Sequence, residues 1–463
     1  MSKLDKNIEL HFDKGSLILK AEKDVIKEHP GPCWVWDDRT ETYRTLGMNY
    51  SQVIKSFPEE TFTDHVKSFE KQTWNWKEER TLRPYQSEAL EAWRRAWGKG
   101  FVVLPTGAGK SLLALNAINK TGLDTLIIVP TLDLMVQWMT DLERAFEMEI
   151  GQLGGGEYSV KPITVSTYDS AHIHMENLGH QFGLMVFDEC HHLPSTSYQW
   201  IAKMSCAPFR LGLSATPERN DGGDLLLMEL IGSEVYRARV QELKGNYLSD
   251  YETIQLEIEM EEDEKALFQT ERALYTNFIK DAQIDMSHPM GWSIFLQSCF
   301  KTPQGKRAYR AYLTQKKLAK GSRAKLKCLE DLLFKHRHEQ ALVFTDDNET
   351  AYRIGEKLRL PVITHHTKIK ERQLFLELFK QKKFPFLVTS KVLNEGVDIP
   401  AVKVAIIVSG SASVREHVQR LGRVLRKQGE QIAILYEMIS KESGEQWQSR
   451  RRRQHEAYGK SEK

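Results

Sequence analysis

The chain has 463 residues, and this length allows roughly three domains of ordinary size. Hydrophobic residues make up 41% and charged residues 28%, a balance typical of globular proteins that excludes wholesale disorder. With 65 Lys and Arg against 63 Asp and Glu, the net charge is +2, so any basic binding surface must be local. No apolar run approaches the ~20 residues that span a bilayer, and the five cysteines show no metal-ligand spacing. We therefore expect a reduced, soluble, cytoplasmic protein.

The first part of the chain, residues 1–65, is expected to form a small α+β module. Short strands are predicted at 12–20 and at 33–36. Trp34 and Trp36 would alternate along the second strand and face one side of it, which is typical of core packing. No chemistry is visible in this segment.

The next part, residues 66–250, is typical of an α/β lobe. Pro84 suits the first turn of a helix, and short apolar runs then alternate with helical stretches. Because these runs are apolar throughout, we expect strands of a parallel sheet covered by helices on both faces. The predicted strands lie at 101–105, 125–130, 163–167, 183–189 and 209–216.

A mainly helical insertion is predicted at 251–323, followed by a second α/β lobe at 324–440 and a basic polar tail at 441–463. Residues 301–327 of the insertion hold ten Lys or Arg and no acidic residue. This charge fits a solvated helix face. It also fits a DNA grip in which Lys316 and Lys317 meet phosphates. Strands of the second lobe are expected at 341–347, 361–366, 384–390, 402–409 and 431–437.

The strongest signal for chemistry lies between a predicted strand and a predicted helix, and it reads Leu104-Pro105-Thr106-Gly107-Ala108-Gly109-Lys110-Ser111. Small residues let backbone N–H groups wrap a phosphate at the positive end of the helix. Lys110 would neutralise β- and γ-phosphate oxygens, and Ser111 would ligate Mg²⁺. The full pattern begins with glycine where this chain has Leu104. The alternative is a glycine-rich turn that carries an incidental lysine.

A pair of acids, Asp188 and Glu189, ends another predicted strand at the same edge of the sheet. Asp188 would complete the Mg²⁺ shell, and Glu189 would orient or deprotonate the attacking water. Such a pair alone is more often a solvated strand end, but the phosphate loop favours nucleotide hydrolysis. For His191 we expect a coupling or structural role, because it and the adjacent His192 point in different directions.

The second lobe contains QRLGRVLR at 419–426, which places Arg423 and Arg426 on one face if the segment is helical. Two guanidiniums suit a developing phosphate charge, although an exposed basic helix is the ordinary interpretation. The first lobe shows no arginine for this purpose. We therefore expect the second lobe to supply it across a cleft that closes on ATP.

This ordered set of motifs resembles superfamily 2 helicases and, more narrowly, the XPB family of DNA-repair helicases in its short form. The motifs are LRPYQ (82–86), LPTGAGKS (104–111), VPT (129–131), STY (166–168), DECH (188–191), SATP (214–217), VFT (343–345), TSKVLNEGVDIP (389–400) and QRLGRVLR (419–426). The segment WVWDDRTETYR resembles the family's damage-recognition domain, and the helical insertion resembles its thumb. On this resemblance, Trp34 and Trp36 offer the alternative of a stacking surface for distorted DNA.

The resemblance implies two RecA-like lobes and an ATP-dependent DNA helicase or translocase of 3'-5' polarity, acting in DNA repair, with a repair nuclease as partner. It also implies roles for further residues. These are adenine recognition by Arg83 and Gln86; coupling by Ser214, Ala215 and Thr216; ribose and phosphate contacts by Gly396 and Asp398; γ-phosphate contacts by Gln419, Arg423 and Arg426; and DNA contacts by Pro130, Thr131, Ser166, Thr167, Arg219, Asp221, Thr389 and Ser390.

The chain departs from the family after SATP, where an Arg-Glu-Asp trio is replaced by Arg219-Asn220-Asp221. Because the central acid is missing, we expect strand melting to be weaker than translocation or ATP hydrolysis. Two alternatives are an RNA helicase and a duplex-DNA translocase that does not unwind. A third is a DNA-binding scaffold with a vestigial ATPase, against which the intact set of Lys110, Asp188, Glu189 and Arg426 argues.

Overall fold

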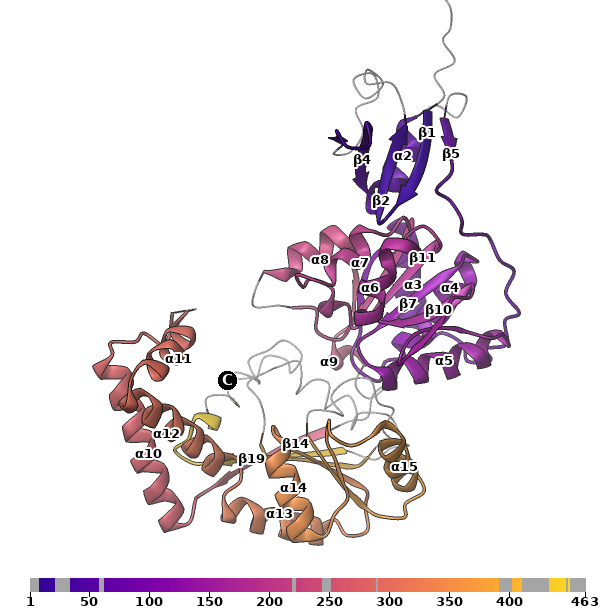
Figure 1. Ribbon diagram of the computed structural model, residues 1–463. Coiled ribbons are helices and arrows are strands. Elements are labelled where there is room, and N and C mark those ends of the chain that lie inside the picture. Colours follow the sequence, from indigo (N-terminus) through magenta and orange to yellow (C-terminus); the bar gives the residue numbers. More distant parts are fainter. Residues whose placement is uncertain are drawn as a thin grey trace, which may run out of the picture. The chain divides into compact units, whose positions relative to one another are not determined.

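The computed structural model describes residues 8–20, 34–57, 62–218, 222–243, 251–288, 290–390, 402–409, 433–446 and 449. The chain divides into two compact units, one made of residues 1–242 with 395–398 and the other of residues 243–394 with 399–463 (Figure 1). Each unit contains its own large parallel sheet. Within the described residues, no helix combines the length and the apolar character needed to cross a membrane.

The amino-terminal module of the first unit is a five-stranded sheet with the order β3-β4-β2-β1-β5. The segment 12–20, predicted as one strand, is instead part of a hairpin, because Lys14 and Gly15 turn the chain with φ of 47° and 79°. The described elements of the module are β1 (Ile8–Asp13), β2 (Ser16–Lys20), β3 (Val35–Asp37), β4 (Thr42–Leu46), the 3-10 helix η1 (Gly47–Asn49), α2 (Tyr50–Ser56) and β5 (Phe62–Asp64).

The module packs tightly on the α/β lobe that follows it in the same unit. Cys206 of the lobe is buried in the hydrophobic cluster of the module, beside residues of β1 and α2 such as Leu10 and Val53. Gly47 permits close approach, since a Cβ there would lie 2.3 Å from the carbonyl oxygen of Met204. The module and the lobe therefore share part of one core.

The first lobe is built on an eight-stranded sheet with the order β13-β6-β12-β11-β7-β10-β8-β9, parallel except between β8 and β9. All five predicted strands are confirmed, with ends shifted by a few residues. The strands β7, β10 and β11 are buried along their whole length, as expected for a sheet covered on both faces. The strands are β6 (Lys99–Val103), β7 (Thr125–Val129), β8 (Gly151–Gly154), β9 (Glu157–Ser159), β10 (Ile163–Thr167), β11 (Leu184–Asp188), β12 (Phe209–Ser214) and β13 (Glu234–Arg237).

Helices follow most of these strands and pack on the faces of the sheet (Figure 1). Their amphipathic pattern buries apolar residues such as Trp93 and Trp138 while polar residues remain outside. The described helices are α3 (Pro84–Arg95), α4 (Lys110–Thr121), α5 (Leu132–Phe146), α6 (Tyr168–Leu178), the 3-10 helix η3 (Cys190–His192), α7 (Gln199–Lys203), α8 (Gly223–Ile231) and α9 (Val240–Leu243).

The second unit contains a six-stranded, wholly parallel sheet with the order β14-β19-β18-β15-β17-β16. Residues 251–258, predicted as the start of the helical insertion, are instead strand β14, which pairs with β19 over eight residues. The reason is the alternating pattern YETIQLEI, whose Ile254, Leu256 and Ile258 pack on the core. The elements are β14 (Tyr251–Ile258), α13 (Arg323–Lys335), β15 (Ala341–Phe344), α14 (Asn348–Leu358), β16 (Val362–Ile363), α15 (Ile369–Lys380), β17 (Phe386–Thr389), β18 (Val404–Ile407) and β19 (Ala433–Ser440).

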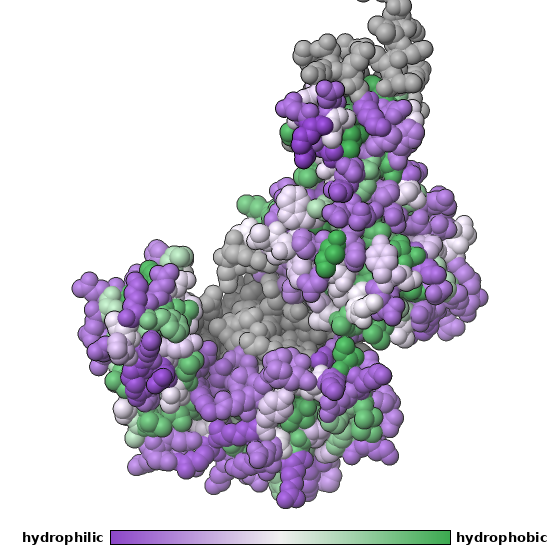
Figure 2. All heavy atoms as spheres, viewed as in Figure 1, coloured by the Kyte–Doolittle hydropathy of each residue, from purple (hydrophilic) through white to green (hydrophobic). Residues whose placement is uncertain are grey.

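The helical insertion consists of α10 (Glu262–Asp281), α11 (Gly291–Lys301) and α12 (Pro303–Lys320), here called the arm. Phe295 is fully buried at its centre, with the rings of Tyr275 and Tyr312 at 5.4 and 6.2 Å. Figure 2 shows apolar areas that interrupt the polar surface of the arm. Large apolar side chains exposed there include Leu267, Leu274, Trp292, Ile294, Phe300 and Leu313.

Candidate active site

The glycine-rich loop lies between β6 and α4, as the sequence predicted. Gly107 and Gly109 adopt φ of 85° and 78°, a left-handed conformation that favours glycine. Leu104, at the position where the full pattern has glycine, is fully buried and donates its N–H to Ser214 O over 3.0 Å. Leu104 therefore continues the pairing of β6 with β12 and is not part of the turn of the glycine-rich loop. Leucine is tolerated there for this reason.

Two residues at the start of α3 hold the loop in place. Gln86 Nε2 donates to the carbonyl oxygens of Ala108 and Gly109 over 2.9 and 3.1 Å, and Tyr85 OH donates to Ala108 O over 2.8 Å. A Cβ on Gly109 would be strained at φ 78° and would lie 2.4 Å from Gln86 Nε2, so a larger residue would displace that amide. Gln86 Oε1 accepts from the backbone N–H of Arg83 over 2.8 Å. The side-chain amide of Gln86 therefore binds protein groups, while Arg83 is exposed.

Asp188 ends β11 and is almost completely buried. Trp138 Nε1 of α5 donates to its Oδ2 over 2.9 Å, and the backbone N–H of Glu189 donates to its Oδ1 over 3.0 Å. Burial and the neighbouring Glu189 raise the pKa of Asp188 above its usual range, while Lys110 and the hydrogen bond from Trp138 act in the opposite direction. The carboxylate is thus held in one orientation by two donors.

Glu189 adopts a left-handed backbone conformation with φ 47° and ψ 52°, which is strained for a residue with a side chain. Its Oε1 lies 3.3 Å from Lys110 Nζ, and its Oε2 lies 3.4 Å from His191 Nδ1. The side chains of Lys110 and Glu189 are only 12% and 11% exposed. The fold therefore brings the predicted lysine and the predicted acids together in one partly enclosed place.

A chain of polar contacts leads from the acids to the next strand. His191 is buried, and its Nδ1 lies 3.2 Å from Ser214 Oγ at the end of β12. Ser214 Oγ accepts from the backbone N–H of Thr216 over 3.2 Å. Ala215 lies between them and is half-buried. These are the residues for which a coupling role is expected, and they lie in contact.

The donor set fits a magnesium–triphosphate group. Thr106 Oγ1 is buried, and within the described residues it has no hydrogen-bond partner. The first N–H groups of α4 begin at Lys110, next to the half-buried Ser111. Hydroxyl and carboxylate oxygens, here from Ser111 and Asp188, are the ligands that Mg²⁺ prefers. Loop, lysine and acids are thus the right chemical types for a nucleotide and its metal.

The sequence interpretation gave no role to Trp138, or to Tyr85 and Tyr168 within the LRPYQ and STY motifs, although all three contact the site. Tyr168 OH donates to Asp188 O over 3.1 Å. Each of these aromatic residues falls on the buried face of its helix, and that pattern indicates core packing only. Their polar ends find partners on distant segments, which no local pattern signals.

The residues expected to contact DNA in the first lobe lie at the carboxyl ends of β7 and β10. Thr131 Oγ1 and Thr167 Oγ1 accept from backbone N–H groups and cap α5 and α6. Pro130 precedes Thr131 and is half-buried. Ser166 is fully buried and donates to Thr167 O over 3.0 Å. Its side chain does not reach the surface.

Two further residues with this expected role, Thr389 and Ser390, end β17 in the second unit. Both are buried, and Thr389 Oγ1 donates to Ser390 O over 3.0 Å. As at Ser166, the hydroxyls face the interior. Any contact of these three residues with a strand would have to use backbone groups.

The basic segment 301–327 is less free than its composition suggests. Lys317 forms an ion pair with Glu349 of α14, whereas Lys316 lies over the ring of Tyr312 with Nζ 5.7 Å from the centroid. Lys316 is therefore the better candidate for a phosphate contact. Cations of this segment that have acidic partners are Arg307, Lys317, Lys320, Arg323 and Lys325.

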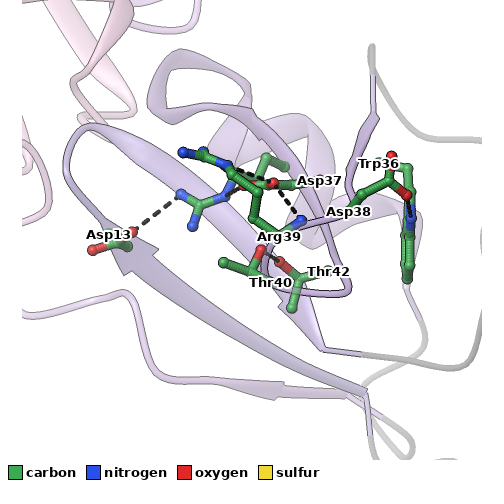
Figure 3. A network of polar contacts seen from close by, with 8 residues as sticks. Asp13, Trp36, Asp37, Asp38, Arg39, Thr40 and Thr42 are labelled. Atoms are coloured by element: carbon green, nitrogen blue, oxygen red, sulfur yellow. Dashed lines mark hydrogen bonds and ion pairs between the residues drawn. The ribbon is translucent and has the colours of Figure 1, made fainter.

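The two tryptophans of the module are in different environments, and Figure 3 shows that of Trp36. Trp34 precedes β3 and packs against the hydrophobic cluster of the module. Trp36 lies in β3, donates from Nε1 to Asp38 over 2.8 Å and contacts the ring of Tyr43 edge-on at 4.8 Å. Core packing thus accounts for Trp34, whereas Trp36 donates to Asp38, next to the ion pairs of Asp37 with Arg39 and Arg44.

Several predicted site residues lie outside the described residues, and the structure says nothing of them. They are Arg219, Asp221, Gly396, Asp398, Gln419, Arg423 and Arg426.

Comparison with known families matches three parts of the chain. Residues 10–66 match the Xeroderma pigmentosum group B helicase damage recognition domain. Residues 79–219 match the type III restriction enzyme, res subunit, and residues 324–428 match the helicase conserved C-terminal domain.

Individual proteins are also similar over most of the chain. A Sulfurisphaera tokodaii protein named DNA 3'-5' translocase XPB2 is 36% identical over 431 residues, covering 93% of this chain and 98% of that protein. Proteins named DNA 3'-5' helicase XPB from Kineococcus radiotolerans and Mycobacterium tuberculosis are 31% and 30% identical, over 79% and 78% of this chain. The aligned part spans 61% of each of the latter two proteins.

Proposed function

This chain belongs to the XPB family of superfamily 2 helicases, and we propose that it is an ATP-dependent DNA helicase or translocase that moves 3' to 5' and acts in DNA repair. The observation that carries the proposal is the enclosed contact of Lys110 with Glu189, 3.3 Å apart and adjacent to the buried Asp188. The relatives named as 3'-5' helicases or translocases support the polarity and the choice of DNA.

For hydrolysis, we propose that Lys110 exchanges its contact with Glu189 for the phosphate oxygens of ATP. Glu189 Oε1 is then available to accept a proton from the attacking water. Ser111 and Asp188 would hold Mg²⁺, which when bound neutralises charge on the phosphates. Thr106 Oγ1, buried without a hydrogen-bond partner in the described part of the chain, would donate to a phosphate oxygen.

For coupling, we propose that the loss of the Lys110 contact is transmitted through the short contacts of Glu189, His191 and Ser214. Ser214 lies at the end of β12 and accepts from the N–H of Thr216, so a change at Glu189 reaches a neighbouring strand end directly. We propose that residues expected from the sequence of the second lobe, 324–440, complete the site, namely Gly396, Asp398, Gln419, Arg423 and Arg426.

A second candidate is a translocase that unwinds poorly, and two observations favour it. The chain has Asn220 where the family carries an acid. The Sulfurisphaera tokodaii relative, which aligns over 98% of its length, is named a translocase rather than a helicase. Asn220→Glu should raise strand separation per ATP consumed. An unchanged ratio would show that Asn220 is not the cause of poor unwinding.

The test is phosphate release by the full chain with single-stranded DNA, duplex DNA and RNA, run beside strand separation on tailed duplexes. We expect DNA to stimulate turnover, Lys110→Ala to abolish it, and Lys120→Ala at the exposed end of α4 to leave it unchanged. Stimulation by RNA alone would indicate an RNA helicase. Absence of turnover in the wild type would favour the DNA-binding scaffold.

The proposal also includes a cytoplasmic, DNA-associated location and a repair nuclease as partner. Purification of the tagged chain from its own cells, followed by assays for DNA cleavage, tests the partner. Recovery of the chain without any nuclease would contradict the proposed partner but not the proposed ATP-dependent activity.

A further inference from the structure

The outer face of the sheet in the amino-terminal module carries a group of side chains that the proposed function does not use. On β1, Ile8 and Leu10 face the core, so Glu9 and His11 face outward. On β5 the parallel register aligns Glu9 with Thr63 and Leu10 with Asp64. The ladder continues with the N–H of His65 donating to Leu10 O over 2.9 Å, which sets His65 beside His11.

The three outward groups are close enough to share one ion. His11 Nε2 lies 3.0 Å from Glu9 Oε2, and the rings of His11 and His65 stack at 4.7 Å with an interplanar angle of 15°. One ligand atom from each of the three lies within 4.8 Å of the others. Tetrahedral coordination at normal zinc bond lengths needs separations of about 3.3 Å, so the stacked rings must rotate to bring their nitrogens onto one ion.

We propose that Glu9, His11 and His65 bind a divalent transition-metal ion of the zinc class. Two imidazoles and one carboxylate form a three-ligand set with one position open. Imidazole nitrogens select zinc, cobalt, nickel or copper over the hard cations magnesium and calcium, which prefer oxygen ligands. The site is therefore chemically distinct from the magnesium ligands Ser111 and Asp188.

The charges around the site favour the ligating form of the carboxylate. Lys20 faces Glu9 across the β1–β2 pair. The side chains of Glu9 and His11 are 39% and 31% exposed, and His65 is exposed, so the site is shallow and we expect weaker binding than in a closed four-ligand site.

The site lies across strands β1 and β5, and this position indicates a structural role for the ion. Strand β5 pairs with β1 over only three residue pairs, and it is the last strand before the chain leaves the module for the lobe. An ion held by both strands would join this strand to the sheet. Because the ligands come together only in the folded state, binding stabilises the module by mass action.

The experiment uses the full chain, stripped of metal with a chelator and then titrated with Co²⁺ or Zn²⁺ in excess Mg²⁺. We expect one ion per chain, a visible Co²⁺ absorption band and a higher melting temperature with Zn²⁺. His11→Gln and His65→Gln should each weaken binding by roughly tenfold or more and abolish the thermal shift. The control His338→Gln, at an exposed histidine of the second unit, should change neither.

Loss of binding counts only if the metal-free variants melt at the wild-type temperature, because a misfolded module would also lose the ion. Glu9→Gln, which preserves size, provides a third variant with the same expected loss. Wild-type affinity in both histidine variants, or no binding by the wild type in excess zinc, would overturn the proposal. Neither outcome would contradict the proposed ATP hydrolysis at the glycine-rich loop.

Discussion

The substitution Trp138→Phe tests whether the metal-binding carboxylate must be held by a neighbouring indole. Trp138 Nε1 donates to Asp188 Oδ2 over 2.9 Å, and both side chains are buried. Phenylalanine preserves most of the ring packing of α5 but removes the donor. A hydrogen bond to a charged group contributes about 1.5–3 kcal/mol. At about 1.4 kcal/mol per decade, half-saturation by Mg²⁺ should require roughly 10- to 150-fold more of the ion.

The pH dependence provides a second readout of the same contact. Burial raises the pKa of Asp188 to about 6, and the Trp138 hydrogen bond opposes that rise. The folded pKa lies above the unfolded value, so ionised Asp188 costs stability at neutral pH and protonation relieves that cost below about 6. Because Asp188 must be deprotonated to bind Mg²⁺, wild-type ATP hydrolysis should decline as pH falls through about 6. In Trp138→Phe this decline should begin at higher pH.

The assay is steady-state phosphate release with saturating DNA, measured over a Mg²⁺ series at several pH values. Trp97→Phe is the matched control, because Trp97 is 88% exposed. A merely structural role for Trp138 would lower activity at all pH values and Mg²⁺ concentrations alike. Unchanged Mg²⁺ half-saturation and an unchanged acid limb in a folded variant would refute the reasoning.

Three further predictions concern other contacts. Glu189→Gln should reduce turnover by roughly 10²- to 10⁴-fold while ATP binding persists, because the lost group accepts a proton rather than binding phosphate. Lys325→Met should lower the free energy of unfolding of the second unit by about 3–5 kcal/mol in urea titrations, because the fully buried Lys325 Nζ lies 2.7 Å from Glu445 Oε2. Lys316→Ala should reduce the slope of log affinity for DNA against log salt by roughly 1.

Two of these predictions have a control variant, and each has a result that would contradict it. Glu176→Gln, at an exposed site on α6, should hydrolyse ATP normally, and Glu189→Gln turnover within tenfold of wild type would remove the proton-acceptor role. A change in unfolding free energy under about 1 kcal/mol for the Lys325 variant would mean that Glu445 finds water or another partner. Lys317→Ala should alter the salt slope less than Lys316→Ala, and an equal effect would contradict the contrast between the two lysines.

Much of the fold and the centre of the candidate site followed from local sequence. Apolar runs such as 163–167 became buried parallel strands, because burying such a run on both sides of a sheet is the most favourable use of it. The phosphate loop was equally visible, since Gly107 and Gly109 adopt backbone conformations that other residues disfavour. Lys110, Asp188 and Glu189 were identified because parallel strands deliver their carboxyl ends to one edge.

Other features depend on pairing between segments far apart in the chain, and a local pattern carries no information about them. Strand β14 pairs with β19, about 180 residues away, so its place in the second sheet was not foreseen. Trp138 contacts Asp188, and Lys317 forms an ion pair with Glu349. His11 and His65 are neighbours only because β5 returns beside β1. Backbone propensity and hydrophobic periodicity act over a few residues, whereas register and side-chain partners are set when distant surfaces pack together.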